Sequence, residues 1–200
     1  HVSFVRSAIK MFQALPLVEG GGIERFGLTP QELALCTASH GGEPFHVAAA
    51  RSILAKVKVT EDALACGPQA PMHVPSADAL KVAGIAPTRI HNNCSGKHGG
   101  MLAFTSQQGW VTNGYHKHSH PTQRRMKDAL AHWTGVQGDT IPLAVDGCGL
   151  PTFGACRRPR RADSTLATRR PGSPDPGEPA NGEGLRAAGL SERARQRDAY

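Results

Sequence analysis

A change in composition at residue 156 constrains the fold of this chain more than any other feature. Residues 156–200 hold ten Arg, no Lys, five Pro and five Gly, and their only Leu, Ile, Val, Phe or Met residues are Leu166, Leu185 and Leu190. Such a segment cannot bury enough apolar surface to offset the entropy lost when its backbone is ordered. We therefore predict that residues 1–155 form the folded domain and that 156–200 is a disordered tail.

The change is abrupt and falls just after 150–154, which read as a strand or core segment. A GC-rich gene translated out of frame yields this mixture of Arg, Pro, Gly and Ala, so we expect the tail not to be native to the domain. The chain also begins at His1, within residues 2–5 that already read as a strand. These observations predict a domain that is truncated at both ends.

Charge and cysteine usage narrow the class of protein. Residues 1–155 carry seven Lys and six Arg against ten acidic residues, and the tail carries ten Arg against six, so the formal excess of +7 is divided between the two parts. No aromatic residue interleaves with the tail arginines, which argues against nucleic-acid binding. No apolar run approaches the roughly 18 residues of a membrane span, and no signal peptide is evident, so a cytoplasmic protein is expected.

The five cysteines form no CxxC pair, which favours free thiols with room for a metal.

Hydrophobic periodicity and helix-start signals indicate more helix than strand. Thr29-Pro30-Gln31-Glu32 combines an N-cap, Pro at the first helical position and Glu at the third, which predicts a capping box. Residues 20–22, all Gly, are expected to form a loop. Further helices are predicted at 7–15 (ended or kinked near Pro16), 43–57, 62–65, 76–82, 95–105 and 121–133, the last with Met126, Ala129, Leu130 and Trp133 facing inward. A buried strand is predicted at 141–145, and the fold class is α+β.

The first stretch that contains candidate catalytic residues is Arg6-Ser7-Ala8-Ile9-Lys10. Side chains three apart on a helix share a face, so Ser7 and Lys10 can form a nucleophile and its base if Lys10 is partly desolvated. The alternative is an N-cap serine beside a solvated lysine. A similar choice holds for Ser39-His40-Gly41-Gly42-Glu43, where Ser39 is either a second hydroxyl of the site or part of an ordinary helix cap.

Two further stretches concentrate reactive groups. Residues 91–98 read His-Asn-Asn-Cys-Ser-Gly-Lys-His, with Cys94 and Lys97 three apart at a predicted helix start, and 146–148 read Asp-Gly-Cys after a predicted strand. The alternative for both thiols is a role as small core residues. His116, His118 and His120 alternate and form a second, weaker candidate for a metal site.

Taken in order, these strings resemble the rhizobial-type (class 3) L-asparaginases over nearly all of residues 4–153. The resemblance implies a fold like that of the serine β-lactamases and penicillin-binding proteins, a homodimer, and hydrolysis of L-asparagine to L-aspartate and ammonia. It implies Ser7 as the nucleophile, Lys10 as its base and Ser39 as a second active-site serine. It also implies Zn²⁺ held by Cys94, Lys97 and Cys148, with Asp146 beside the metal and with Arg6, His91, Asn92 and Asn93 binding substrate or lying next to the site.

The resemblance also shows what this chain lacks. The family chain continues well beyond Thr152, and a lysine that pairs with the second serine lies in that region, whereas the tail has no Lys. Two alternatives therefore stay open: a related SxxK serine hydrolase of the β-lactamase kind, and a catalytically inactive fragment that binds metal.

Overall fold

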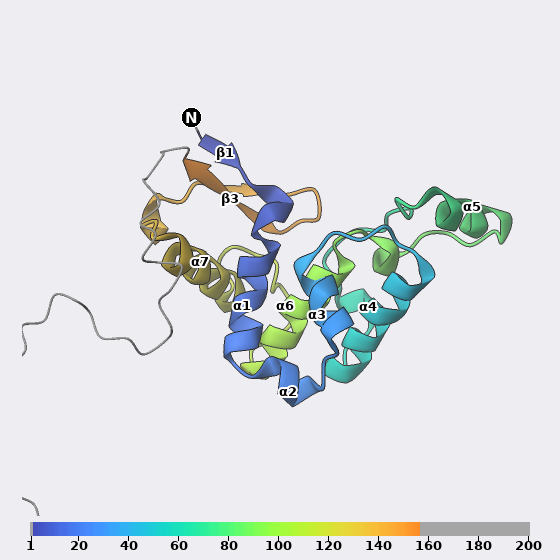
Figure 1. The fold of residues 1–200 in the computed structure, drawn as a ribbon, viewed down its shortest axis with the longest axis horizontal. Coiled ribbons are helices and arrows are strands. Elements are labelled where there is room, and N and C mark those ends of the chain that lie inside the picture. The colour runs from blue at the N-terminus through green and yellow to red at the C-terminus, as the bar shows by residue number, and fades with distance from the viewer. Residues whose placement is uncertain (1, 157–200) are drawn as a thin grey trace, which may run out of the picture. The chain divides into compact units, whose positions relative to one another are not determined.

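The computed structural model describes residues 2–156, which form a helix-rich α+β fold with one small sheet (Figure 1). The predicted tail lies outside the described residues except for Cys156, which the structure places in a strand. The first half contains β1 (Val2–Phe4), the 3₁₀ helix η1 (Arg6–Ile9), α1 (Lys10–Glu19), α2 (Gly22–Phe26), α3 (Pro30–Thr37), α4 (Pro44–Val57), η2 (Glu61–Ala63) and α5 (Val74–Val82). The second half contains η3 (Arg89–His91), α6 (Ser95–Gln107), α7 (Pro121–Thr134), η4 (Gly138–Thr140), β2 (Leu143–Val145) and β3 (Pro151–Cys156).

The sheet joins the beginning of the described chain to its end. Its strand order is β1-β3-β2 and both pairs are antiparallel, with Phe4 opposite Gly154 and Leu143 opposite Phe153. The prediction of a buried strand at 141–145 was wrong in extent and in burial. The strand covers only 143–145, and Leu143 and Val145 are 46% and 77% exposed. The reason is that β2 lies at the edge of the sheet, whereas Phe153 on central β3 is buried.

Helix α6 is the centre of the helical part. Its residues from Ser95 to Thr105 are all buried, and it packs against α1, α3 and α4. A helix that is buried all round needs small residues where its neighbours approach closely. Gly96 meets that need against α3, because a Cβ there would lie 2.5 Å from the Leu35 carbonyl oxygen. Gly100 does the same against Cys36, at 2.9 Å from its Sγ.

Local signals correctly predicted several helix starts. Thr29 and Glu32 form the reciprocal capping box, and Pro30 opens α3. Glu32 also pairs with Lys56 of α4 at 2.6 Å, which ties the two helices together. In α4 periodicity predicts one apolar face made of Val47, Ala50, Ile53, Leu54 and Val57. The last four are buried in the core, and Val47 is partly buried against it.

Pro16 does not end the first helix, so the first of the two outcomes predicted for it, an end or a kink, was wrong. Helix α1 contains Pro16 in its interior and runs on to Glu19. An interior proline costs about 3 kcal/mol because it removes a backbone hydrogen bond and crowds the preceding turn. The helix continues because Pro16 and Leu17 are buried where α1 packs against α6 and α7. Tertiary packing here outweighs a strong local signal.

Two smaller predictions also need correction. The glycine loop is shorter than expected, because Gly22 already starts α2. Trp133 does not face inward: it is 52% exposed at the end of α7, where its indole N–H donates to Glu19 at 3.2 Å. The other three residues of that predicted face, Met126, Ala129 and Leu130, are buried.

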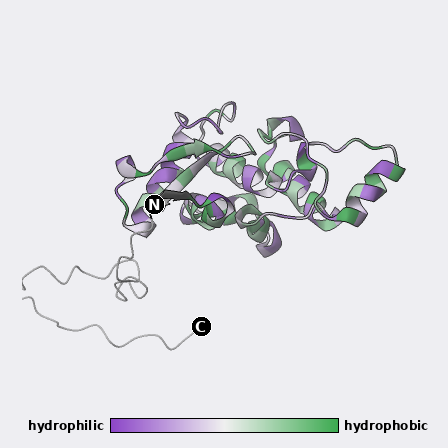
Figure 2. Cartoon of the chain, turned by 90° about the horizontal axis from the view of Figure 1, so that it is seen from above, coloured by the Kyte–Doolittle hydropathy of each residue, from purple (hydrophilic) through white to green (hydrophobic). Residues whose placement is uncertain are grey.

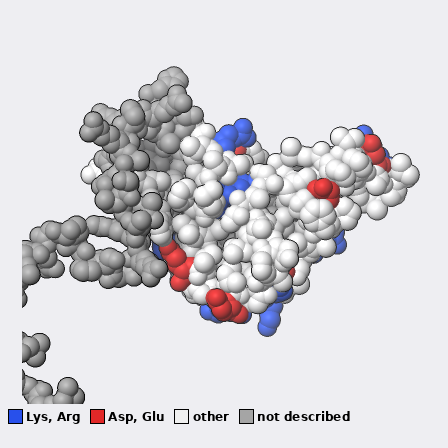
Figure 3. Space-filling view, in the orientation of Figure 1, with Lys and Arg blue, Asp and Glu red and all other residues white. Residues whose placement is uncertain are grey.

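Within residues 2–156, helix α5 projects from the end opposite the sheet (Figures 1 and 2). It contains no buried residue, and Val74 and Val82 are exposed. On the face drawn in Figure 3 the charged side chains are scattered rather than gathered into one surface. Within residues 2–156, no helix combines the length and apolar character needed to cross a membrane.

We predict that Gly96→Ala destabilises the fold. Alanine favours a helix by about 1 kcal/mol over glycine, but the new Cβ meets backbone atoms of α3 that cannot step aside, and overpacking costs about 1–3 kcal/mol. Because the new Cβ would lie only 2.5 Å from a backbone oxygen, the cost falls at the upper end of this range, and the expected net loss is about 2 kcal/mol in urea unfolding. Gly67→Ala is the matched control, since nothing lies within 4 Å of a Cβ there. Equal stability of the two variants would contradict this account of the α3–α6 contact.

Candidate active site

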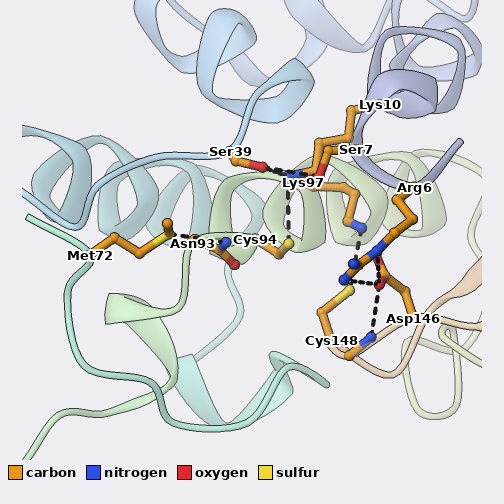
Figure 4. A network of polar contacts seen from close by, with 11 residues as sticks. Arg6, Ser7, Lys10, Ser39, Met72, Asn93, Cys94, Lys97, Asp146 and Cys148 are labelled. Atoms are coloured by element: carbon orange, nitrogen blue, oxygen red, sulfur yellow. Dashed lines mark hydrogen bonds and ion pairs between the residues drawn. The ribbon is translucent and has the colours of Figure 1, made fainter.

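Most of the residues singled out in the sequence meet at one place between the sheet and α6 (Figure 4). They come from four segments far apart in the chain. The start of the first helices supplies Arg6, Ser7 and Lys10, and the loop after α3 supplies Ser39. The first turn of α6 supplies Cys94 and Lys97, and the turn between β2 and β3 supplies Asp146 and Cys148.

The two serines and Lys10 form a line of hydrogen bonds. The Lys10 ammonium donates to Ser39 Oγ at 2.6 Å, and the Ser39 hydroxyl donates to Ser7 Oγ at 3.2 Å. Among the described residues no hydrogen bond joins Lys10 directly to Ser7. The spacing argument had expected a direct pair, but Ser7 lies on η1 and Lys10 begins α1, so Ser39 stands between them.

Lys10 is held in an environment that favours its neutral form. Its side chain is buried, whereas both serines are exposed to solvent. Burial lowers the pKa of Lys10, and the nearby Lys97 charge adds to this effect, while Cys94 opposes it with its Sγ at 3.5 Å from Nζ. A lysine whose pKa is lowered by burial can serve as a general base near neutral pH.

Cys94, Lys97 and Cys148 place two sulfurs and one amine together. The Lys97 ammonium donates to Cys148 Sγ at 3.3 Å, and all three side chains are buried. The interaction between the two thiols lowers the pKa of Cys148, assisted by His98 and by the Lys97 charge. The same interaction, together with burial, raises the pKa of Cys94.

Arg6 and Asp146 link the two halves of the site. The Arg6 guanidinium donates from Nε to Asp146 Oδ1 at 3.1 Å, and its Nη2 lies 3.0 Å from the same oxygen. Asp146 also accepts from the Gly147 backbone N–H. Arg6 has φ of 45°, in the left-handed region that non-glycine residues seldom adopt. The chain is therefore strained immediately before Ser7.

The three residues 91–93 were expected to line the site, and the structure gives them different surroundings. His91 accepts from the Thr88 backbone N–H through Nδ1, away from the network. Asn92 is buried and braces the turn, because its side chain accepts from the Cys94 N–H and donates to the Gly67 carbonyl. Asn93 lies beside Cys94, with its amide directed at Met72 (Figure 4).

The loop that presents Ser39 is anchored through the next residue, His40. The His40 backbone N–H donates to the Asn93 carbonyl, and its buried ring accepts from the Gly42 N–H and bonds to Ser95 Oγ at 2.9 Å. Gly42 has φ of 80°, and a Cβ there would meet Pro71 at 2.9 Å. The Gly42 backbone therefore approaches a neighbouring loop closely.

With this geometry described, the chain can be compared with known protein families. A family model described as L-asparaginase II matches residues 1–159 of the chain. The chain belongs to the L-asparaginase II family. Its family is thus one of amidohydrolases that act on asparagine, as the ordered motifs had predicted. A comparison with curated proteins gave no match.

The alternating histidines behave differently from the asparaginase motif residues. His120 uses both ring nitrogens locally, accepting from the Thr122 N–H and bonding to the Val111 carbonyl, so it caps α7. His116 and His118 border a hollow of about 500 Å³ beside β2. That hollow shares no residue with the Ser7 network, and its strand side is apolar. We therefore place the candidate active site at the Ser7 network and not in this hollow.

Two buried residues next to the asparaginase site had no assigned role in the sequence reasoning. His98 follows Lys97 on α6 and is fully buried, and its Nδ1 lies 2.6 Å from the Tyr115 hydroxyl. His98 belongs to the motif at residues 91–98, so the sequence already pointed to it. Tyr115 had no sequence signal of this kind, because only the fold brings its loop under α6.

We predict that acid weakens the fold partly through His40. Burial, together with the charges of His46 and Lys10, lowers the pKa of His40 to about 4. The unfolded chain, with an ordinary histidine pKa near 6.5, takes up the proton first. This contribution to stability is complete above about pH 6.5 and is lost as the pH falls toward 4, by up to about 1.4 kcal/mol per unit.

Urea unfolding between pH 7 and pH 4 measures this effect. His40→Gln should show a shallower loss of stability than the unchanged chain. Some loss should remain, because the buried His98 and the partly buried His116, whose pKa values are also lowered, still contribute. His132→Gln, at an exposed position on α7, is the control and should leave the slope unchanged. A slope that His40→Gln does not alter would rule out His40 as a source.

Proposed function

We propose that this site hydrolyses L-asparagine to L-aspartate and ammonia, with Ser7 as the nucleophile and Lys10 as its base acting through Ser39. The observation that carries the proposal is the hydrogen-bonded line from Lys10 to Ser39 to Ser7. Membership of the L-asparaginase II family supports the substrate. We also propose the serine β-lactamase-like fold that the resemblance implies, of which the described residues supply an α+β part.

The proposed proton path runs along this line. When Lys10 is neutral, the Ser7 hydroxyl gives its proton to Ser39, and Ser39 gives its own to Lys10. Ser7 Oγ then attacks the side-chain amide carbon of asparagine. The proton held by Lys10 passes back along the path to the leaving nitrogen, and ammonia departs. Water activated by the same base releases aspartate and restores Ser7.

The backbone around Ser7 is consistent with a nucleophile. Strained residues cluster at active sites, where the surrounding structure holds them in place. Arg6 has a strained backbone. Its ion pair with Asp146 and the adjoining strand β1 hold it in this conformation. This arrangement presents Ser7 Oγ to solvent while the base beneath it stays buried.

We further propose that Cys94, Lys97 and Cys148 hold Zn²⁺. Thiolate sulfur is a preferred zinc ligand, and three protein ligands leave a fourth position open. The fit rests on the chemistry of the donor set: two buried sulfurs and a buried amine lie together, and the amine donates to Cys148 Sγ at 3.3 Å. Bound zinc would act as a Lewis acid that orients the substrate beside Ser7. Lys97 must lose its proton to serve, which couples binding to pH.

The remaining parts of the proposal follow from the family resemblance. Arg6 and Asp146 hold the turn that carries Cys148 against the segment that carries Ser7. The working form is proposed to be a cytoplasmic homodimer, which size-exclusion chromatography with light scattering and cell fractionation would test.

The nucleophile is tested by ammonia release from L-asparagine, assayed on this chain and on a chain completed with the C-terminal region of the family. Ser7→Ala should reduce turnover by about a thousandfold or more, and Lys10→Arg nearly as much, because a guanidinium cannot act as a base at neutral pH. Ser39→Ala should fall between these variants and the unchanged chain, since water can bridge the gap that it leaves.

Ser119→Ala, at an exposed serine away from the site, should retain full activity. More than about a tenth of the activity in Ser7→Ala would reject its role. If neither chain released ammonia from asparagine, the proposed substrate would be wrong.

The zinc proposal is tested by metal analysis of the purified chain at neutral pH. We expect about one zinc per chain, and Cys148→Ser should lose most of it. Cys36→Ser is the matched control, because Cys36 is a buried thiol of the same core on another side of α6. Zinc that stays with Cys148→Ser would place the metal elsewhere, with His116 and His118 examined next.

A further inference from the structure

The loop between α3 and α4, residues 38–43, supplies two acceptors for the Lys10 amine. Lys10 Nζ donates to Ser39 Oγ at 2.6 Å and to the Ala38 carbonyl at 3.0 Å, and Ser39 Oγ lies 3.2 Å from Ser7 Oγ. A carbonyl oxygen moves with its backbone, and the short serine side chain has little reach of its own. The groups that hold this loop in place therefore also hold the proposed proton path in place.

His40, directly after Ser39, ties this loop to the start of α6. Its backbone N–H donates to the Asn93 carbonyl at 3.1 Å, and its ring Nε2 lies 2.9 Å from Ser95 Oγ. Within the loop, the Gly42 N–H donates to His40 Nδ1 at 3.2 Å. The His40 side chain is only 4% exposed, so these partners replace the water that a free imidazole would bind.

The direction of these bonds follows from what each group can donate. A backbone N–H only donates, so His40 Nδ1 accepts from Gly42 and carries no proton. In a neutral imidazole the ring proton is then on Nε2, from which it is donated to Ser95 Oγ. Burial lowers the pKa of His40 to about 4, so this neutral ring is the form present at pH 7. The Ser95 hydroxyl in turn donates to the Ile90 carbonyl at 2.9 Å.

We propose that His40 is a positioning residue, whose ring and backbone hydrogen bonds to the start of α6 hold the loop where Ser39 reaches Lys10. Within residues 2–156, His40 makes no hydrogen bond to Lys10 or to either serine of the proton path, so it acts through the loop. The effect on turnover rests on the function proposed above, whereas the hydrogen bonds that hold the loop do not.

The place where His40 attaches favours this role. Asn93 and Ser95, its two partners at the start of α6, flank Cys94 in the chain, and Cys94 Sγ lies 3.5 Å from Lys10 Nζ. The loop is thus bound to the same turn that Lys10 already approaches, so the amine and its acceptors share one rigid support. A displacement of about 1 Å in such an arrangement can cost about 100-fold in rate.

Steady-state kinetics of ammonia release from L-asparagine test the role, on whichever of the two chains described above shows turnover. His40→Leu removes both ring bonds and should lower kcat by about 10- to 100-fold with little change in KM, because the proton path acts in the chemical step. His40→Gln keeps an N–H that can reach Ser95 and should lose less. All rates are divided by the folded fraction from circular dichroism.

His120→Gln is the matched control. The His120 ring also accepts from a backbone N–H and bonds to a second partner, but it does so at the start of α7, away from the site. This variant should keep the kcat of the unchanged chain. A kcat that His40→Leu leaves unchanged, or one that His120→Gln lowers as much, would overturn the positioning role.

A double-mutant cycle separates positioning of Ser39 from a general disturbance of the site. If His40 acts through Ser39, then His40→Leu should lower kcat by less than about threefold in a chain that already carries Ser39→Ala. A general disturbance would lower kcat by the same factor in both backgrounds. That result would overturn the proposal.

The hydrogen bonds are tested without turnover on the full 200-residue chain labelled with ¹⁵N-histidine. In two-bond ¹⁵N–¹H spectra at pH 7, His40, assigned by the loss of its signal in His40→Gln, should carry its proton on Nε2. Ser95→Ala should shift that resonance, whereas Ser106→Ala, near the other end of α6, should not. A proton on Nδ1, or a resonance that Ser95→Ala leaves unmoved, would contradict the proposed attachment.

The kinetic and spectroscopic measurements distinguish two kinds of failure. If neither chain released ammonia, the proposed function would be wrong, and the spectra would still decide whether His40 holds the loop. If His40→Leu did not fold, Ser95→Ala would take its place, because it removes the partner of Nε2 and leaves the ring itself intact. Ser95→Ala should then lower kcat without changing KM, and an unchanged kcat would count against the role of His40.

Discussion

The complete burial of the first three turns of α6 is the constraint on which the rest of this structure depends. A helix surrounded by α1, α3 and α4 can place polar groups in the core only if each one has a partner. Its glycines let α3 approach to backbone contact. Its first turn carries Cys94, Lys97 and His98, and their partners arrive from other segments. The same burial that stabilises the fold therefore collects the reactive groups.

Burial also controls the chemistry of these groups. Lys10 is desolvated and its pKa is lowered, while the serine hydroxyls that it reaches stay exposed. Lys97 donates to Cys148 Sγ and its charge helps to lower the pKa of that thiol, so the charge of Lys97 has a partner within the core. Arg6 lies where the chain passes from strand β1 to this core, and its strained backbone is held by the ion pair with Asp146.

Local sequence signals predicted the helices well wherever a cap or a long periodic face was present. The capping box at Thr29 and the apolar face of α4 are examples. The errors came where tertiary contacts overrode local preference. Pro16 stays inside α1 because its surroundings are packed, Val145 is exposed because β2 is an edge strand, and Trp133 turns outward to bond Glu19. None of these outcomes is encoded within a few residues of the position concerned.

For the site, the sequence by itself determined which reactive groups are present and in what order, and the order of the motifs was enough to predict the L-asparaginase II family. The tertiary structure alone decided which groups meet. Lys10 bonds to Ser39, 29 residues away, and approaches Cys94, 84 residues away. Tyr115 reaches His98 only because a loop folds beneath α6. Periodicity reports which side chains share a face of one element, but a hydrogen bond requires two elements to be placed within a few tenths of an ångström, and only the packed core does that.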